Sequence, residues 1–89
     1  MISLLCDALF HLGNAYGKIG EYQKALDCFI RASELTPENP YYYLAAASAL
    51  DRAARVEEAI ALYEQVLEKE IDPRYRESVE TRIRELREI

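Results

Sequence analysis

The sequence is poor in the residues that most often carry chemistry or interrupt regular structure. Among 89 residues it has no tryptophan, one histidine, one methionine, two cysteines, three glycines and three prolines. So few glycines and prolines, with 51% hydrophobic residues, argue against disorder and favour a packed helical protein. The length allows one small domain, which disfavours a two-domain enzyme with a deep cofactor cleft.

The scarcity of cysteine and histidine also limits the chemistry. Cys6 and Cys28 are too few for a disulfide framework and form no CxxC pair, so we expect two free thiols and a cytoplasmic protein. His11 has no second histidine or cysteine nearby, and we expect no metal site. No Ser/His/Asp or Cys/His arrangement and no glycine-rich phosphate loop is present, so we expect neither an enzyme nor a cofactor.

A basic surplus is missing as well. The chain carries 16 acidic and 11 basic side chains, with a net charge of −5 at pH 7. Contact with a phosphate backbone requires the opposite sign, so nucleic acid is not an expected partner. The apolar start, MISLL, has no basic region before it and is interrupted by Asp7, which predicts neither a signal peptide nor a membrane span.

Helical periodicity dominates what is present. The spacing of apolar residues predicts five helices, at about 3–18, 21–35, 40–52, 56–70 and 73–88. Gly20 is placed to end the first helix. Asn39-Pro40 and Asp72-Pro73 each give a capping side chain followed by a proline at the first helical position. Because the same start signal occurs twice at an interval typical of helical repeats, we expect the chain to contain a repeat.

Two of the predicted helices carry an apolar stripe on one face, and we expect the stripe of the fifth helix to face inward. On the first helix the stripe is Leu5, Leu9, Leu12, Ala15 and Tyr16. On the fifth helix it is Tyr75, Val79, Ile83 and Leu86.

The residues of the first repeat resemble the tetratricopeptide repeat (TPR) pattern. The matching positions are Leu9-x2-Leu12-Gly13-x2-Tyr16, then Ala25-x3-Phe29, then Pro37. The second copy is degenerate, with Tyr43-x2-Ala46-Ala47-x2-Leu50 and Ala59-x3-Tyr63. The chain thus resembles one domain, 1–89, made of a repeat at 6–39, a degenerate repeat at 40–73 and a solvating helix at 74–89. The resemblance implies an all-α, right-handed superhelix of antiparallel helical hairpins.

The resemblance also implies a function. TPR proteins are interaction modules, such as adaptors, scaffolds or co-chaperones, whose first helices line a concave groove for a peptide or helix of a partner protein. The positions of this chain that match the groove are Phe10, Asn14, Lys18, Tyr41, Leu44, Ser48, Arg52 and Tyr75.

The typical two-carboxylate clamp for chaperone C-termini is not expected. It needs a lysine and an asparagine on the first helix, an asparagine on the third and two cations on the fifth. Of these the sequence keeps only Asn14, with Phe10 in place of the lysine and Ala45 in place of the second asparagine. Tyr75 and Val79 stand where the two cations would be.

No polar capping element precedes the first repeat. Met1, Ile2, Leu4 and Leu5 form an apolar cluster at that end, which repeat arrays normally cover. Two explanations remain open at this point. Either the cluster is an oligomer interface with a second copy or a partner subunit, or the chain is a fragment whose upstream repeats are missing.

Overall fold

The computed structural model describes residues 2–89 as an all-α protein, which confirms the expected fold class. Its helices are α1 (Ile2–Lys18), α2 (Tyr22–Leu35), α3 (Pro40–Arg52), α4 (Val56–Leu67) and α5 (Pro73–Arg87). The largest difference from expectation is at the end of α4, which was expected to continue to Glu70. There the amides of Glu68 and Lys69 bond to carbonyls three residues back, at 3.2 and 3.1 Å, a tighter turn that closes the helix.

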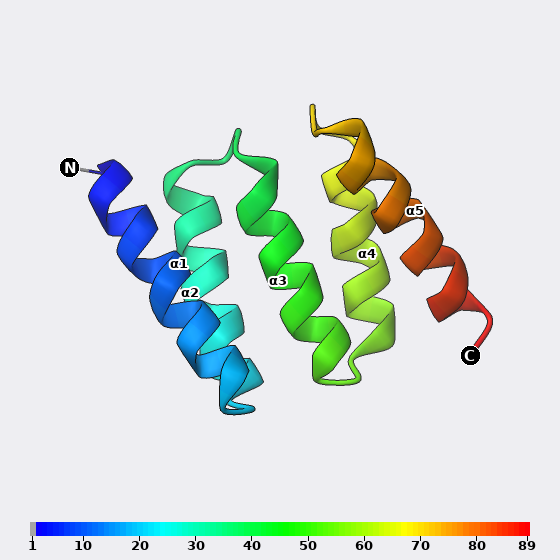
Figure 1. Cartoon of the computed structure of the whole chain (residues 1–89), viewed down its shortest axis with the longest axis horizontal. Helices are drawn as coiled ribbons and strands as arrows, with labels where there is room; N and C mark the ends of the chain where they lie inside the picture. Colours follow the sequence, from blue (N-terminus) through cyan, green and yellow to red (C-terminus); the bar gives the residue numbers. More distant parts are fainter. Residues whose placement is uncertain (1) are drawn as a thin grey trace.

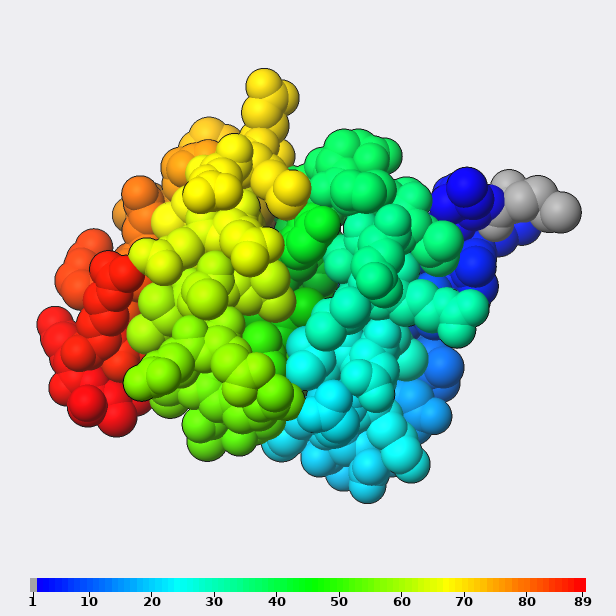
Figure 2. Space-filling view, turned by 180° about the vertical axis from the view of Figure 1, so that it is seen from behind, coloured from blue at the N-terminus to red at the C-terminus, as the bar shows by residue number. Residues whose placement is uncertain are grey.

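The helices form antiparallel hairpins in two layers. Each helix packs against the next one along the chain. Helices α1, α3 and α5 lie side by side in one layer, with α2 and α4 behind them (Figure 1). Seen from behind, α2 and α4 cover the opposite face (Figure 2). The first helices of the hairpins therefore share one surface of the molecule.

The two predicted capping signals form as expected. The Asn39 side chain accepts a hydrogen bond from the Tyr41 amide at 2.9 Å, and Asp72 accepts one from the Arg74 amide at 2.9 Å. In each case the following proline occupies the first turn, where its missing N–H costs nothing. A side-chain cap of this kind stabilises a helix by about 1 kcal/mol.

The turns inside the two hairpins have the same backbone. Gly20 has φ +83°, and Ala54, at the matching place in the second hairpin, has φ +63°. The amide after each of them, that of Glu21 or Arg55, reaches back to Tyr16 or Leu50 at 2.9 Å. Glycine enters this left-handed region freely, whereas alanine does so at a cost of roughly 1–2 kcal/mol. The degenerate second repeat thus keeps the conformation without the residue that suits it.

Small residues allow close helix packing inside each hairpin. Gly13 lies so near the buried Phe29 ring that a Cβ placed on it would be 2.6 Å from the ring. Ala47 and Tyr63 occupy the same positions in the second repeat, and both are buried. The core then continues through Val79, Ile83 and Leu86 of α5.

The apolar stripe of α1 is largely uncovered. The buried residues of α1 are Cys6 and Gly13, whereas Leu5 and Leu12 are exposed. The periodicity identifies an apolar stripe, but no helix within residues 2–89 covers that side of α1. On α5, Tyr75 belongs to the apolar stripe and also matches a groove position; it is 48% exposed, because it extends toward α3 rather than toward α4.

Both cysteines are free thiols, as their number and spacing predicted, and both are buried. None of the described helices combines the length and the apolar character that crossing a membrane requires. Among residues 2–89 no three histidine, cysteine or acidic side chains gather in a way that could hold a metal ion.

Candidate partner-binding groove

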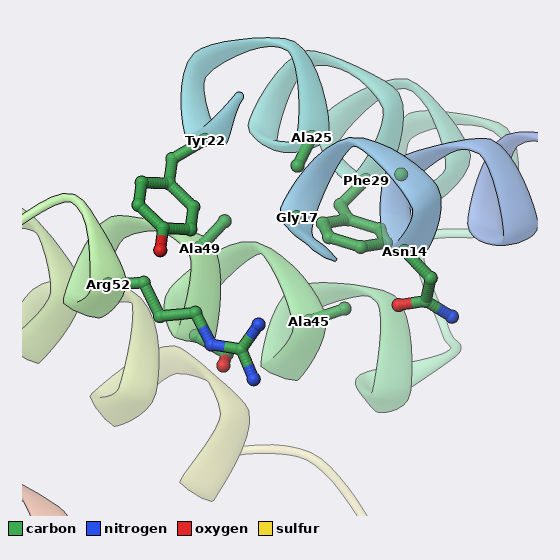
Figure 3. Close-up of a pocket in the computed structure, with 10 residues that line it drawn as sticks. Asn14, Gly17, Tyr22, Ala25, Phe29, Ala45, Ala49 and Arg52 are labelled. Carbon is green, nitrogen blue, oxygen red and sulfur yellow. The ribbon is translucent and has the colours of Figure 1, made fainter. Parts of the chain in front are cut away.

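The surface shared by α1 and α3 contains a small cavity of about 90 Å³, which we call the α1/α3 cavity. Figure 3 shows the Phe29 ring beside Gly17, with the side chains of Asn14 and Arg52 at the rim. The cavity exists because small residues, Gly17 on α1 with Ala45 and Ala49 on α3, face each other across the gap. The full lining is Gly13, Asn14, Gly17, Tyr22, Ala25, Phe29, Ala45, Ser48, Ala49 and Arg52.

A more open, polar depression adjoins this cavity. It is lined by His11, Asn14, Ala15, Lys18 and Arg52, so Asn14 and Arg52 border both hollows. Lys18 and Arg52 place two positive charges here in a chain of net charge −5. Neither cation takes part in an ion pair within residues 2–89. This end of the groove therefore suits an anionic group.

A second hollow lies between α3 and α5, and its walls are mainly apolar. Its volume is about 180 Å³ and its lining is Leu44, Tyr63, Tyr75, Ser78, Val79 and Arg82. Tyr41 and Tyr75 meet edge to face beside it, with ring centroids 5.4 Å apart. The Tyr41 hydroxyl also accepts a hydrogen bond from the Asp72 amide at 3.4 Å. The two rings remain 40% and 48% exposed, and together they form an aromatic surface.

A partly buried polar network, formed by Asp51, Tyr63 and Arg82, lies beside this second hollow. Asp51 on α3 accepts hydrogen bonds from Arg82 Nε and Nη2, both at 2.7 Å, and from the Tyr63 hydroxyl at 3.0 Å. The bonds from Arg82 hold the pKa of Asp51 below its usual value of 3.8, against the opposing effect of burial. Burial and the bond to Asp51 raise the pKa of Tyr63 well above its usual value. The network ties α5 to the second hairpin.

The structure brings most of the predicted groove residues to these hollows. Asn14, Ser48 and Arg52 line the α1/α3 cavity, and Lys18 lines the adjoining depression. Leu44 and Tyr75 line the second hollow, with Tyr41 against Tyr75.

Phe10 differs from this expectation. Its half-buried ring packs between Phe29 and Tyr42, with centroids 5.8 and 5.9 Å away, and lines neither hollow. Phe10 therefore supports the core beneath the groove. Sequence reasoning also missed the Asp51–Arg82–Tyr63 network, for which no local pattern gives a signal.

The apolar cluster at the first helix is exposed where it is described. Ile2, Leu4 and Leu5 are 55%, 72% and 43% exposed. Met1, which was expected to belong to the same cluster, lies outside the described residues.

Antiparallel hairpins that share a turn geometry, pack in two layers and present one hollowed surface define an α-helical repeat protein. Two family models, both described as tetratricopeptide repeat, match residues 6–39 and 43–77. The chain belongs to the tetratricopeptide repeat family, as the motif positions predicted. Membership of this family supports a role as a protein-interaction module.

Known proteins with a similar sequence include Superkiller complex protein 3 of two mammals. The mouse protein is 36% identical over 67 residues, which are 75% of this chain, and the human protein is 38% identical over 61 residues, which are 68% of it. In both cases the match spans 4% of the length of the relative. The similarity therefore concerns a small segment of a much longer protein.

Proposed function

We propose that the chain binds a short segment of a partner protein in the groove formed by α1, α3 and α5, and so acts as an adaptor or scaffold. The observation that carries this proposal is the presence of two hollows on the same surface. One is rimmed by polar and positively charged groups, and the other is bordered by the exposed Tyr41–Tyr75 pair. The second hollow can hold apolar side chains of the partner segment, and the α1/α3 cavity with its rim can hold polar ones.

The dimensions of the groove limit the ligand and its affinity. Three neighbouring helices, each roughly 10 Å from the next across the layer, accommodate an extended segment of about 6–10 residues at roughly 3.3 Å per residue. Such an interface is smaller than a standard protein–protein interface. We therefore expect micromolar dissociation constants, equivalent to about −8 kcal/mol.

The aromatic pair is the strongest candidate for the main energetic contact. Tyrosine provides a large apolar area together with a hydroxyl, and few rotatable bonds are frozen when it is covered. Interface residues of this type often lose about 2 kcal/mol or more, roughly thirtyfold in affinity, when truncated to alanine. Here Tyr41 and Tyr75 hold each other in an edge-to-face arrangement, so they are ordered before a ligand arrives.

Selection of decapeptides from a random display library tests the proposal. Peptides that bind the wild-type chain should lose at least tenfold in affinity with Tyr41→Ala or Tyr75→Ala, measured by calorimetry. Ile30→Ala is the matched control, because Ile30 is 40% exposed but lies on α2, in the opposite layer. If every selected peptide binds the tyrosine variants as well as it binds the control, the groove assignment is wrong.

A second function is favoured by a different surface. We propose as an alternative that the chain self-assembles through the exposed cluster of Ile2, Leu4 and Leu5. Exposed apolar patches of this kind are typical of interaction sites. A strict monomer at high micromolar concentration in light scattering would exclude this alternative. A dimer that persists after Ile2 and Leu5 are both changed to lysine would instead assign the contact to another surface.

The setting of either function is also part of the proposal. Cys6 and Cys28 are both free thiols, which suits a reducing compartment such as the cytoplasm. The relatives are named as proteins of a complex, which favours a role within a larger assembly.

A further inference from the structure

We infer that the α1/α3 cavity receives the side-chain carboxylate of an aspartate or glutamate in the bound partner segment, with Arg52 as its counter-charge. This inference rests on the proposed binding of a partner segment in the groove. It specifies the chemistry of one position of that segment.

A comparison of the two layers of the groove supports the inference. Gly20 and Ala54 share their turn geometry, so the number of residues between them relates each position of α1 to its counterpart on α3. The caps Asn39 and Asp72 relate the positions of α3 to those of α5 in the same way, and they are one residue closer together in the sequence than Gly20 and Ala54 are. By this alignment Asp51, Tyr63 and Arg82 of the second layer correspond to Gly17, Phe29 and Ala49 of the first.

The second layer therefore contains a carboxylate that the first layer lacks. In the second layer Asp51 fills the space between the hairpin and the next helix, held by Arg82 and the Tyr63 hydroxyl. In the first layer the counterparts Gly17, Phe29 and Ala49 have no polar group in their side chains, and all three line the α1/α3 cavity. The cavity is thus the space that an acidic side chain and its partners occupy one layer further on.

A positive charge nevertheless remains at the cavity. Arg52 Nη1 lies 3.8 Å from the point where a Cβ of Gly17 would be. Because Gly17 is the counterpart of Asp51, a side chain at this point would correspond to the one that carries the Asp51 carboxylate. No acidic residue is among those that line this cavity or the adjoining depression. A guanidinium pairs with a carboxylate through two charge-assisted hydrogen bonds, stronger than neutral ones, and Lys18 adds a second cation at the rim.

The size of the cavity selects the same chemistry. Pockets for drug-sized ligands are usually roughly 300–1,000 Å³, whereas this cavity has about 90 Å³. That volume suits a short side chain and is too small for an aromatic ring system with its own polar groups. A lysine or arginine of the partner would meet Arg52 with the same sign of charge.

The first test is an NMR titration of the ¹⁵N-labelled chain with N-acetyl-glutamate N-methylamide, whose only carboxylate is on its side chain. We expect saturable shifts of the Gly17 amide and the Arg52 Nε–H signal, and at least tenfold weaker binding of the neutral glutamine analogue. Arg52→Gln should abolish the saturable shift at Gly17. Arg31→Gln, on α2, should leave both signals unchanged. Equal binding of the two analogues, or a Gly17 shift that survives Arg52→Gln, would overturn the inference.

A second measurement needs no ligand. Gly17→Asp supplies an internal carboxylate next to Arg52, whereas Gly17→Asn supplies a neutral side chain of the same shape. At pH 7 we expect the aspartate variant to melt at a higher temperature than the asparagine variant, and this difference to vanish when Arg52→Gln is added. An equal or lower melting temperature for Gly17→Asp with Arg52 present would contradict the placement of the charge.

Two further outcomes separate this inference from its alternatives. Stronger binding of N-acetylglycine than of the glutamate analogue would assign the cavity to a chain terminus and overturn the choice of a side chain. Selected peptides that depend on Tyr41 but bind equally with glutamate or glutamine at every position would overturn the carboxylate site while the proposed groove function stands.

Discussion

Replacing Gly13 by alanine should lower the free energy of unfolding, although alanine is the better helix former. The exchange gains about 1 kcal/mol in helix propensity. The new methyl carbon, however, would lie 2.6, 2.8 and 3.0 Å from three atoms of the Phe29 ring. Phe29 is 5% exposed and its ring packs against Phe10, so a shift of the ring away from the new methyl group would disturb this aromatic contact. Overpacking costs about 1–3 kcal/mol, and contacts this short belong in the upper part of that range, at about 2–3 kcal/mol. After the gain in propensity we expect a net loss of about 1–2 kcal/mol.

Gly17→Ala is the matched control for this prediction. It is the same substitution on the same helix, but its methyl carbon would lie 3.8 Å from the nearest other atom, Arg52 Nη1, which is an ordinary contact. Because Gly17 is close to the end of α1, we expect only part of the propensity gain, about 0.5 kcal/mol. The two substitutions should therefore change stability in opposite directions.

Thermal and urea denaturation followed by circular dichroism measure both effects. For a chain of this size about 1 kcal/mol shifts the melting temperature by about 4–8 °C, so the two variants should be clearly separated. The double variant Gly13→Ala/Phe29→Leu replaces the ring by a smaller side chain, and it should recover part of the stability that Gly13→Ala alone loses. The packing argument is refuted if Gly13→Ala melts at or above the wild-type temperature, or if Gly17→Ala is destabilised as much as Gly13→Ala.

Two other predictions concern the turn of the second hairpin and the Asp51–Arg82–Tyr63 network. Ala54→Gly should stabilise the fold by about 0.5–1 kcal/mol, because it removes the strain of an alanine in the left-handed region. Gly20→Ala should introduce that strain and destabilise the fold by about 1 kcal/mol. Equal melting temperatures for the wild type and both variants would contradict this prediction. Asp51→Asn should lower the free energy of unfolding by about 1–2 kcal/mol at pH 7, measured by urea denaturation, because it weakens the hydrogen bonds to Arg82. The loss is limited because the Arg82 side chain is 43% exposed and solvent screens the pair. The folded-state pKa of Asp51 is lowered, so its contribution is present above its unfolded pKa and is lost as the pH falls through the folded one. The difference in the free energy of unfolding between the wild type and Asp51→Asn should therefore shrink as the pH falls below the unfolded-state pKa of Asp51. A difference that stays constant would exclude the charged pair as its origin.

The parts of the fold that depend on local chemistry were predictable from the sequence. Helix starts at Asn39 and Asp72 follow from side chains that bond to amides two residues away. Apolar spacing predicted the five helices, and the family resemblance predicted their hairpin arrangement. These features need no knowledge of what lies opposite each helix.

The parts that the sequence could not predict depend on distant neighbours. Leu5 and Leu12 lie on the apolar stripe of α1, but a stripe does not reveal whether a helix covers it, and residues 2–89 contain none that does. Phe10 lies at a groove position by motif, yet its ring turns toward Phe29 and Tyr42. The pairing of Asp51 with Arg82 depends on the offset between α3 and α5, which is shorter by a single residue than the offset between α1 and α3. A shift of that size rotates a helix by about 100°, so a motif alone does not specify the contact.

The sequential packing of the helices has a consequence for how the molecule opens. Because each helix is held mainly by its neighbours along the chain, the two ends can detach without disturbing the middle. Helix α5 packs on α4 over the smallest of the four interfaces, so we expect it to open locally more readily than the other helices. Its release would dismantle the hollow beside Tyr75. A partner seated there would hold α5 closed, and the lifetime of the complex would be coupled to the rate at which this last helix opens.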